Sequence, residues 1–302
     1  MGKLIKPIVR HNKGSHRKMA FYDYHKIVFC YNDNMTIKLI ATDMDGTFLD
    51  IDGAYDRQRF DAVLSKLAAK DIYFVAASGR QLLALESLFA EFKDRVIFIA
   101  ENGGIVKFRD TILFEEKMPF DKVLKIADLL RQSDYVMHDA VLLSGAKGSY
   151  ILDTTNAYYK EKAKHYYENV QVVSDFALVD DDILKLTVNF SAETVLEGEA
   201  WFNRQVQSVR AVTTGFESVD IIPKGISKET GLVHLADKFN IQPSQVLAFG
   251  DNLNDLEMLR YAGTSVAMSN ARDEVKQLAD HVIGHHGDQA VLAYLESLVT
   301  DF

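Results

Sequence analysis

The stretch Thr36–Asp50, TIKLIATDMDGTFLD, joins an apolar run directly to two aspartates that stand two residues apart. The run at 37–42 is rich in aliphatic and β-branched residues, which is typical of a buried strand. Side chains two residues apart on extended backbone project to one side, so we expect Asp43 and Asp45 to point together. Neighbouring carboxylates repel each other unless they share a cation or one is protonated. The stretch therefore predicts a strand that ends at a site for a cation, a proton or both.

The composition of the 302-residue chain is that of an ordinary folded protein, with 48% hydrophobic and 25% charged residues. This length allows one large or two moderate domains. The formal net charge of -9 argues against a nucleic-acid or membrane-surface binder, because both need clustered positive charge. No apolar run approaches the roughly 18 residues of a transmembrane helix. The single cysteine, Cys30, suits a reducing compartment, so we expect a cytoplasmic protein.

Residues 1–34 differ in charge from the rest of the chain. They carry seven Lys/Arg against two Asp/Glu, whereas residues 35–302 carry 27 against 41. The segment shows neither sustained periodicity nor turn-bounded strands, so we expect a disordered or non-native extension. Because Met35 directly precedes the first strong strand, we also expect that the native protein can start there. A basic arm that binds nucleic acid or a partner is the alternative.

Strand-like and helix-like segments alternate on both sides of the middle of the chain. Strands are predicted over 37–42, 72–78, 96–100, 245–251, 264–268 and 281–284, and helices over 56–70, 81–92, 229–240, 254–262 and 271–279. This alternation predicts a mainly parallel sheet with helices on both faces and right-handed crossovers. We therefore expect an α/β fold with a doubly wound, Rossmann-like core formed by residues 35–111 and 223–302.

Between these parts, from residue 112 to 222, apolar and polar residues alternate instead. Half-buried antiparallel strands are predicted at GSYILDT, ILKLTVNFS and VRAVTTGFESVDIIP, with helices over 119–133, 156–168 and 193–205. We expect an α+β domain inserted into the first over residues 112–222.

Polar side chains also follow two other predicted strands. Ser78 and Gly79 open a helix, where a hydroxyl and free amides suit a phosphate oxygen, with a serine helix cap as the alternative. Asp251 ends another strand, and Asn254 and Asp255 follow at helical spacing on one face. Carboxylates at a strand end are typical of a Mg²⁺ site, with a capped acidic helix start as the alternative. In an open parallel sheet these groups belong to one ligand-binding edge.

The remaining candidates lie before helices and in turns. Lys224 and Lys228 precede an amphipathic helix, and a lysine aimed at the site could neutralise a phosphoryl group. A solvated lysine is the alternative for each of them. Gly46 permits a turn after the paired aspartates, which Thr47 can help to close.

The order DMDGT (43–47), SGR (78–80), a lysine before a helix and GDNLND (250–255) resembles the four motifs of the haloacid dehalogenase superfamily. The likeness is to the Cof-type (subfamily IIB) sugar-phosphatase-like hydrolases and spans residues 35–302, with ENGG and VAMSNA as further matches. It implies hydrolysis of small phosphomonoesters with Mg²⁺ through an aspartyl-phosphate. The inserted domain would be a cap that closes over the substrate.

The resemblance implies a role for each motif residue. Asp43 would be the nucleophile, and Asp45 would protonate the leaving alcohol, which requires a raised pKa. Mg²⁺ would be held by Asp43, the backbone carbonyl of Asp45, and Asp251. The residues assigned to the phosphoryl group are Thr47, Ser78, Gly79, Lys228 and Asn254, with Asp255 in support and Lys224 as the fallback lysine.

The sequence departs from the family pattern at its periphery. Glu229 and Ser269 stand where these hydrolases often have Gly, and His285 and His286 replace an Asn-containing segment. The adjacent histidines are expected in a solvated loop, with a transition-metal site as the alternative. A phosphosugar mutase and a non-catalytic phospho-ligand sensor remain alternative functions. The sequence specifies neither the substrate nor the oligomeric state.

Overall fold

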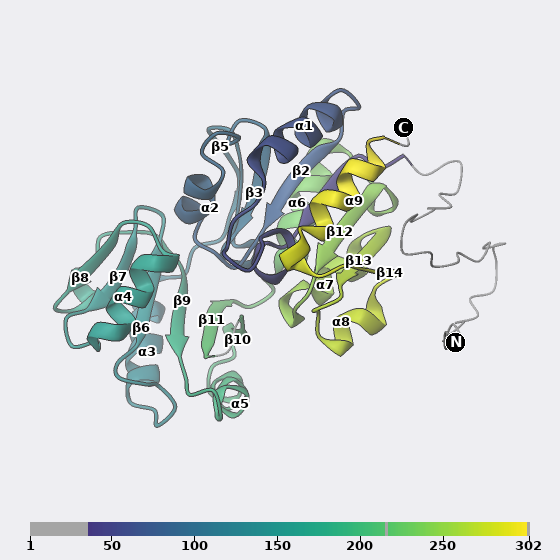
Figure 1. The fold of residues 1–302 in the computed structure, drawn as a ribbon. Coiled ribbons are helices and arrows are strands. Elements are labelled where there is room, and N and C mark those ends of the chain that lie inside the picture. The colour runs from purple at the N-terminus through teal and green to yellow at the C-terminus, as the bar shows by residue number, and fades with distance from the viewer. Residues whose placement is uncertain (1–35, 215–216, 301–302) are drawn as a thin grey trace, which may run out of the picture. The chain divides into compact units, whose positions relative to one another are not determined.

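An eight-stranded sheet forms the larger layer of the computed structural model, which describes residues 36–214 and 217–300 (Figure 1). Its strand order is β14 (His281–Ile283), β13 (Thr264–Met268), β12 (Val246–Gly250), β1 (Leu39–Thr42), β2 (Tyr73–Ala77), β3 (Val96–Ala100), β4 (Ile105–Phe108) and β5 (Thr111–Glu115). All pairings from β14 to β3 are parallel, and β4 and β5 are added antiparallel. The expected α/β fold with a mainly parallel sheet is confirmed.

The predictions for the first 35 residues lie outside the described residues. They are the disordered or non-native extension over 1–34, the start at Met35, and the placement of Cys30. Among the residues that the structure does describe, no helix has both the length and the apolar character to cross a membrane.

Helices cover both faces of the larger sheet. They are α1 (Arg57–Ala68), α2 (Leu82–Leu88), α6 (Lys228–Phe239), α7 (Leu256–Tyr261), α8 (Asp273–Leu278) and α9 (Ala290–Leu298). Consecutive strand residues point to opposite faces. Phe74 of β2 packs edge-on against Phe60 of α1 with ring centroids 4.9 Å apart, whereas Tyr73 stacks on Phe239 of α6 at 4.7 Å. The two helices therefore lie on opposite faces, as a doubly wound core requires (Figure 1).

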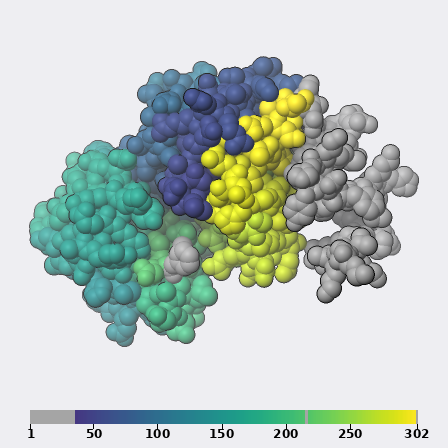
Figure 2. Space-filling model, viewed as in Figure 1, coloured from purple at the N-terminus to yellow at the C-terminus, as the bar shows by residue number. Residues whose placement is uncertain are grey.

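A second sheet contains only residues between 141 and 223. Its order is β10 (Val209–Thr213), β11 (Ser218–Pro223), β9 (Ile183–Asn189), β6 (Val141–Gly145), β7 (Ser149–Leu152) and β8 (Val170–Val173), and its helices are α3 (Phe120–Arg131), α4 (Ala157–Tyr166) and α5 (Val195–Gln205). Neighbouring strands pair antiparallel except β7 with β8. Figure 2 shows these residues, from teal to green, gathered on one continuous surface.

The two faces of the smaller sheet differ in chemistry. Leu186 and Val188 of β9 belong to an apolar cluster that includes side chains of α3 and α5. Lys185 and Thr187 alternate with them and therefore point to the other face. The Nζ of Lys185 donates a hydrogen bond to the carbonyl oxygen of Gly79, beyond the end of β2. The polar face is thus turned toward the larger sheet.

The inserted segment begins later in the structure than residue 112, where we expected it to start. That boundary falls inside β5, which pairs with β4 in the larger sheet. Met118 is the first residue of the apolar cluster under the smaller sheet, and its N–H donates to the carbonyl oxygen of Ile183 at 2.8 Å. We therefore move the proposed start to residues 116–117 and refer to 117–222 as the inserted segment.

A close backbone contact fixes the start of α6. Gly103, in the loop after β3, has φ +100°, and a Cβ there would lie 1.9 Å from the carbonyl oxygen of Ser227. Ser227 is the N-cap of α6, and its hydroxyl and Thr230 form a capping box. The approach that Gly103 permits therefore sets the position of Lys228, the first residue of the helix.

We expect Gly103→Ala to lower the free energy of unfolding by about 3 kcal/mol or more, because the new methyl group overlaps backbone and φ is positive. Gly104→Ala is the matched control, since Gly104 has φ -68° and its nearest neighbouring atom would be 3.3 Å from the new Cβ. Urea unfolding measures both variants. Equal, small losses would contradict the proposed role of Gly103.

Candidate active site

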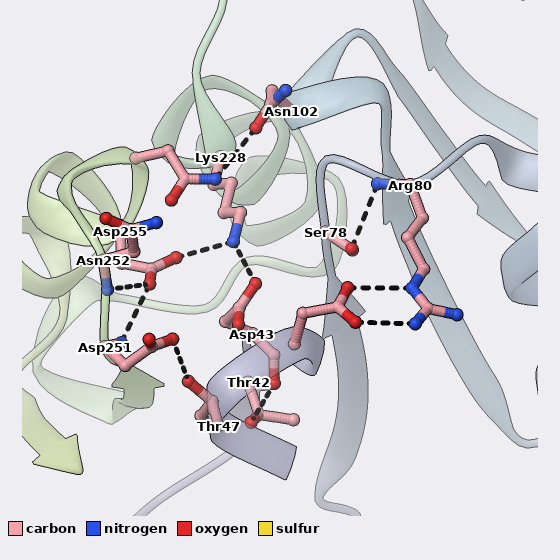
Figure 3. A network of polar contacts seen from close by, with 12 residues as sticks. Thr42, Asp43, Thr47, Ser78, Arg80, Asn102, Lys228, Asp251, Asn252 and Asp255 are labelled. Carbon is pink, nitrogen blue, oxygen red and sulfur yellow. Dashed lines mark hydrogen bonds and ion pairs between the residues drawn. The ribbon is translucent and has the colours of Figure 1, made fainter. Parts of the chain in front are cut away.

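Three predicted segments meet at the carboxyl edge of the parallel strands (Figure 3). Strand β1 lies between β12 and β2, so the strand order reverses beside β1. Such a reversal leaves a crevice at the carboxyl ends of the strands, where ligands bind. Asp43 follows β1, Ser78 follows β2, and Asp251 follows β12. The sequence predicted this convergence.

The paired aspartates point apart, which corrects the expectation that they project together. Gly46 has φ +83° and turns the chain directly after Asp45. Oδ1 of Asp43 lies 2.5 Å from the Nζ of Lys228. Asp45 accepts two hydrogen bonds from Arg80, at 2.8 Å from Nε and 2.6 Å from Nη2. Each carboxylate therefore has its own cationic partner, which relieves the repulsion between them.

Lys228 is buried, and its Nζ also lies 2.6 Å from Oδ1 of Asp255. Burial alone would lower the pKa of Lys228, but the charges of Asp255 and Asp43 outweigh it and hold the pKa above its ordinary value. The side chain is thus an ammonium between two carboxylates. Lys224, the fallback lysine, is exposed.

Asp251 is held by the turn that follows Asp45. Its Oδ1 accepts a hydrogen bond from Oγ1 of Thr47 at 2.8 Å. A Cβ on Gly46 would lie 2.6 Å from its Oδ2, so only glycine permits this approach. Burial, reinforced by the charge of Asp255, raises the pKa of Asp251 to about 6. We expected the hydroxyl of Thr47 to bind the phosphoryl group, but in the structure it donates to Asp251.

Asp43, Asp251 and Asp255 each offer a carboxylate oxygen, and these oxygens lie within 4.8 Å of one another. Burial raises the pKa of Asp43 well above its usual range, and the charges of Asp255 and Asp251 add to this against the opposing effect of Lys228. Such a cluster attracts protons or a hard cation. The residues present therefore fit a Mg²⁺ ion.

The hydrogen bonds of Asp255 limit its role in that cluster. Its Oδ2 accepts the backbone N–H groups of Asp251 and Asn252, both at 3.0 Å, and its Oδ1 accepts from Lys228. Its oxygens are thus committed to ordering the loop. This leaves the side chains of Asp43 and Asp251 available to a cation, and their role as ligands stays a prediction.

Ser78, Gly79 and Asn254, three of the residues expected to bind phosphate, line a cavity of about 940 Å³ between the two sheets, whereas Thr47 and Lys228 are not among its lining residues. From the larger part it is lined by Asp43, Asp45, Gly46, Ser78, Gly79, Arg80, Asp251, Asn252, Asn254, Asn270, Arg272 and His286. The Oγ of Ser78 accepts the N–H of Arg80 at 3.1 Å. Asn254 donates from Nδ2 to Oδ1 of Asn102 at 3.0 Å. Ser78, Gly79 and Asn254 therefore reach the same space as Asp43.

The structure adds two contributors that the sequence did not assign. Arg80 holds Asp45, and its place directly after Ser78 and Gly79 was the available signal. Asn102 joins Asn254 to the inserted segment, because its Nδ2 donates to Asp220 at 2.7 Å. Arg80 stands in the SGR stretch and Asn102 in the ENGG stretch, but their partners Asp45 and Asp220 lie far away in the sequence.

The histidine pair does not lie in a purely solvated loop. The ring Nδ1 of His286 is 2.8 Å from the carbonyl oxygen of Leu49. The backbone N–H of His286 donates to Oδ1 of Asn270 at 3.1 Å. Asn270 donates from Nδ2 to the carbonyl oxygen of Gly46 at 2.8 Å. His285 is exposed and accepts the N–H of Gly287. The segment thus braces the loop that carries Asp43 and Asp45.

Comparison with known proteins agrees with the four motifs. A family model described as haloacid dehalogenase-like hydrolase matches residues 40–295. The 5-amino-6-(5-phospho-D-ribitylamino)uracil phosphatase YbjI of Escherichia coli (strain K12) is 34% identical over 266 residues, which are 88% of this chain and 97% of the relative.

Solved structures share the fold. The protein SMU.1108c of Streptococcus mutans UA159 superposes with a TM-score of 0.83 at 29% identity, covering 88% of this chain and 100% of that one. A sugar phosphatase of haloacid dehalogenase subclass IIB superposes with a TM-score of 0.73, covering 86% and 98%. At 20% identity, this second likeness supports the fold alone.

We expect Lys228→Met to lower the free energy of unfolding by about 3–5 kcal/mol at pH 7.5, because two buried carboxylates lose their cation. The loss should shrink toward pH 5. A carboxyl whose pKa is raised in the folded state costs stability above that pKa and nothing below its unfolded pKa. Urea unfolding at both pH values measures this.

Lys224→Met is the matched control, because Lys224 lies four residues earlier and is exposed. It should change stability by less than about 0.5 kcal/mol. A loss in Lys228→Met that is small, or that is the same at both pH values, would contradict the assigned ion pairs.

Proposed function

The chain belongs to the haloacid dehalogenase-like hydrolases of the Cof type and is a phosphatase, and from that premise we propose that it hydrolyses small phosphomonoesters with Mg²⁺ through an aspartyl-phosphate on Asp43. The observation that carries the proposal is the buried Asp43 carboxylate between Lys228 and Asp251, at the base of a cavity. This arrangement presents a nucleophile beside groups that bind cation and phosphate.

The proposed reaction has two displacements. A carboxylate oxygen of Asp43 forms a bond to phosphorus while the bond to the alcohol oxygen breaks, and Asp45 gives the departing alkoxide a proton. Asp45 then takes a proton from water, which attacks phosphorus and releases Asp43 and inorganic phosphate. In the structure both oxygens of Asp45 accept hydrogen bonds from Arg80, so proton donation requires the side chain to part from Arg80.

The surrounding groups would hold the phosphoryl group and the cation. Mg²⁺, when bound, would shield the negative phosphoryl group from the attacking carboxylate. Asp43, Asp251 and the carbonyl of Asp45 would hold it, and Thr47 would orient Asp251 through its hydrogen bond. The residues proposed for the phosphoryl oxygens are Ser78, Gly79, Lys228 and Asn254, with Asp255 fixing Lys228. Most of the rate gain would come from positioning and charge.

The cavity supports a substrate larger than a phosphate ion. A volume of about 940 Å³ suits a small organic ligand. Tyr159, Tyr166 and Asn189 of the inserted segment line it opposite Asp43. By its name, the Escherichia coli relative acts on a ribityl phosphate attached to a uracil ring. We propose a substrate of that kind, a primary phosphate on a polyol or sugar, with the inserted segment as its cap.

We expect the unmodified protein to release phosphate with Mg²⁺ from at least one member of a panel of sugar, polyol and nucleotide phosphomonoesters. Asp43→Asn should lower kcat by about 10³-fold or more, because the amide cannot attack phosphorus. The control Asp52→Asn, at an exposed aspartate of the same loop, should keep its activity. Retained turnover in Asp43→Asn would exclude the nucleophile assignment. An inactive unmodified protein would exclude the substrate class.

Removal of divalent cations with EDTA should abolish phosphate release, and added Mg²⁺ should restore it. Asp251→Asn should raise the Mg²⁺ concentration for half-maximal activity by about 10- to 100-fold, because a carboxylate ligand is lost. Thr47→Val should raise it less, since Asp251 keeps its charge and loses one hydrogen bond. Activity that persists in EDTA, or an unchanged Mg²⁺ requirement in Asp251→Asn, would contradict the proposed metal site.

A further inference from the structure

A buried lysine of the inserted segment reaches the loop proposed to bind phosphate. Lys185 on β9 exposes 2% of its side chain. Its Nζ donates to the carbonyl oxygen of Gly79 and to Oδ2 of Asp220 on β11, the latter at 2.9 Å. It also lies 3.4 Å from Oε2 of Glu101, in the loop after β3. One ammonium thus joins the smaller sheet to two loops of the larger one.

Asp220 extends this connection to a third loop. Its Oδ2 also accepts the Nδ2 hydrogen of Asn102 at 2.7 Å. Asn102 in turn accepts on Oδ1 from Asn254, at 3.0 Å. A Cβ on Gly79 would meet Asn102 at 3.1 Å and Asp220 at 3.3 Å, so the three are packed together. Lys185 and Asp220 therefore contact, directly or through Asn102, two of the residues assigned to the phosphoryl group.

The polar groups of this cluster, whose members all lie among the described residues, bind one another. Thr187 donates its hydroxyl hydrogen to Oδ1 of Asp220 at 2.7 Å. The hydroxyl of Tyr167, 2.7 Å from that of Thr187, must then be the donor between the two. Lys185 donates hydrogen bonds to Gly79 and Asp220, and it forms an ion pair with Glu101. The cluster therefore holds loops of the larger sheet against the inserted segment.

The charges of the cluster are costly to bury, which argues that its role is more than packing. A buried ion pair often contributes no more stability than well-packed apolar side chains of the same volume. Burial lowers the pKa of Lys185, but Asp220, Tyr167 and Glu101 outweigh it, and the group stays charged. Burial raises the pKa of Glu101 to about 7, although the charge of Lys185 acts to lower it. Lys185 is therefore a fixed charged donor to Gly79.

We propose that Lys185 and Asp220 are positioning residues that complete the phosphate site from the inserted segment. Lys185 fixes the peptide of Gly79 beside Ser78, and Asp220 fixes Asn254 through Asn102. This rests on the proposed function, since it is the phosphoryl group that these loops would hold. The phosphate site would then be fully formed only while the inserted segment occupies the position seen in the structure.

The test compares phosphate affinity in variants of the full chain. Lys185→Met with Asp220→Asn removes both charges together, so no lone ammonium is left buried. If this variant folds, its Kd for inorganic phosphate with Mg²⁺, and its KM for the best phosphomonoester, should rise about 10-fold or more. The Mg²⁺ concentration for half-maximal activity should not change, because Asp43 and Asp251 are untouched. Thermal unfolding reports whether each variant is folded.

Two further variants keep the test decisive. Asp220→Asn alone preserves size and one acceptor oxygen, and it should weaken phosphate binding in the same direction if the double variant fails to fold. Lys147→Met is the matched control. Lys147 belongs to the same segment, and its Nζ also donates to a carbonyl oxygen, that of Asp180 at 3.0 Å, but this carbonyl lies within the segment itself. Its loss should leave phosphate affinity unchanged.

The outcomes separate this proposal from the proposed function. Folded Lys185 and Asp220 variants that bind inorganic phosphate as tightly as the unmodified protein would overturn the positioning role. An equal loss in Lys147→Met would also overturn it, because the effect would then follow from charge alone. If no phosphomonoester is turned over, yet phosphate binding falls only in the Lys185 and Asp220 variants, the catalytic proposal fails and the positioning role stands.

Discussion

The rest of the site depends on one buried ammonium, that of Lys228, between the carboxylates of Asp43 and Asp255. A charge removed from water must be paired, so the three elements that carry these residues cannot shift independently. They are the end of β1, the start of α6 and the loop after β12. The close backbone approach at Gly103 adds the loop after β3 to the same unit. The site is therefore part of the folded core.

Each carboxylate around Lys228 has a distinct set of partners, and these partners determine its chemistry. Asp255 is surrounded by donors and orders its loop, whereas Asp45 faces the cavity and is held by a single guanidinium. Asp43, which is buried, and Asp251, which is partly buried, lie between these extremes and have oxygens available to a ligand. A position that faces Lys228 suits a nucleophile, and one that can exchange partners suits an acid or base.

The sequence predicted the fold class and the convergence of Asp43, Ser78 and Asp251, because strand ends and hydrophobic periods are local features. It did not predict the β4–β5 hairpin, whose turn places Arg109 at φ +55° with none of the usual Gly or Asn signals. It also missed the separation of Asp43 from Asp45. Arg80, the partner of Asp45, lies 35 residues away in the sequence, so the residues next to Asp45 do not reveal this contact.

The ionic groups joined around Asp43 also set the charge balance of the site. Within this group the four carboxylates of Asp43, Asp45, Asp251 and Asp255 outnumber the two cations, Lys228 and Arg80. Burial raises the pKa of Asp43 and that of Asp251, which favours the protonated form of each carboxyl. The divalent cation that we propose for this site would therefore compete with protons for these carboxylates. Metal occupancy and proton occupancy are therefore alternative ways of neutralising the same carboxylates.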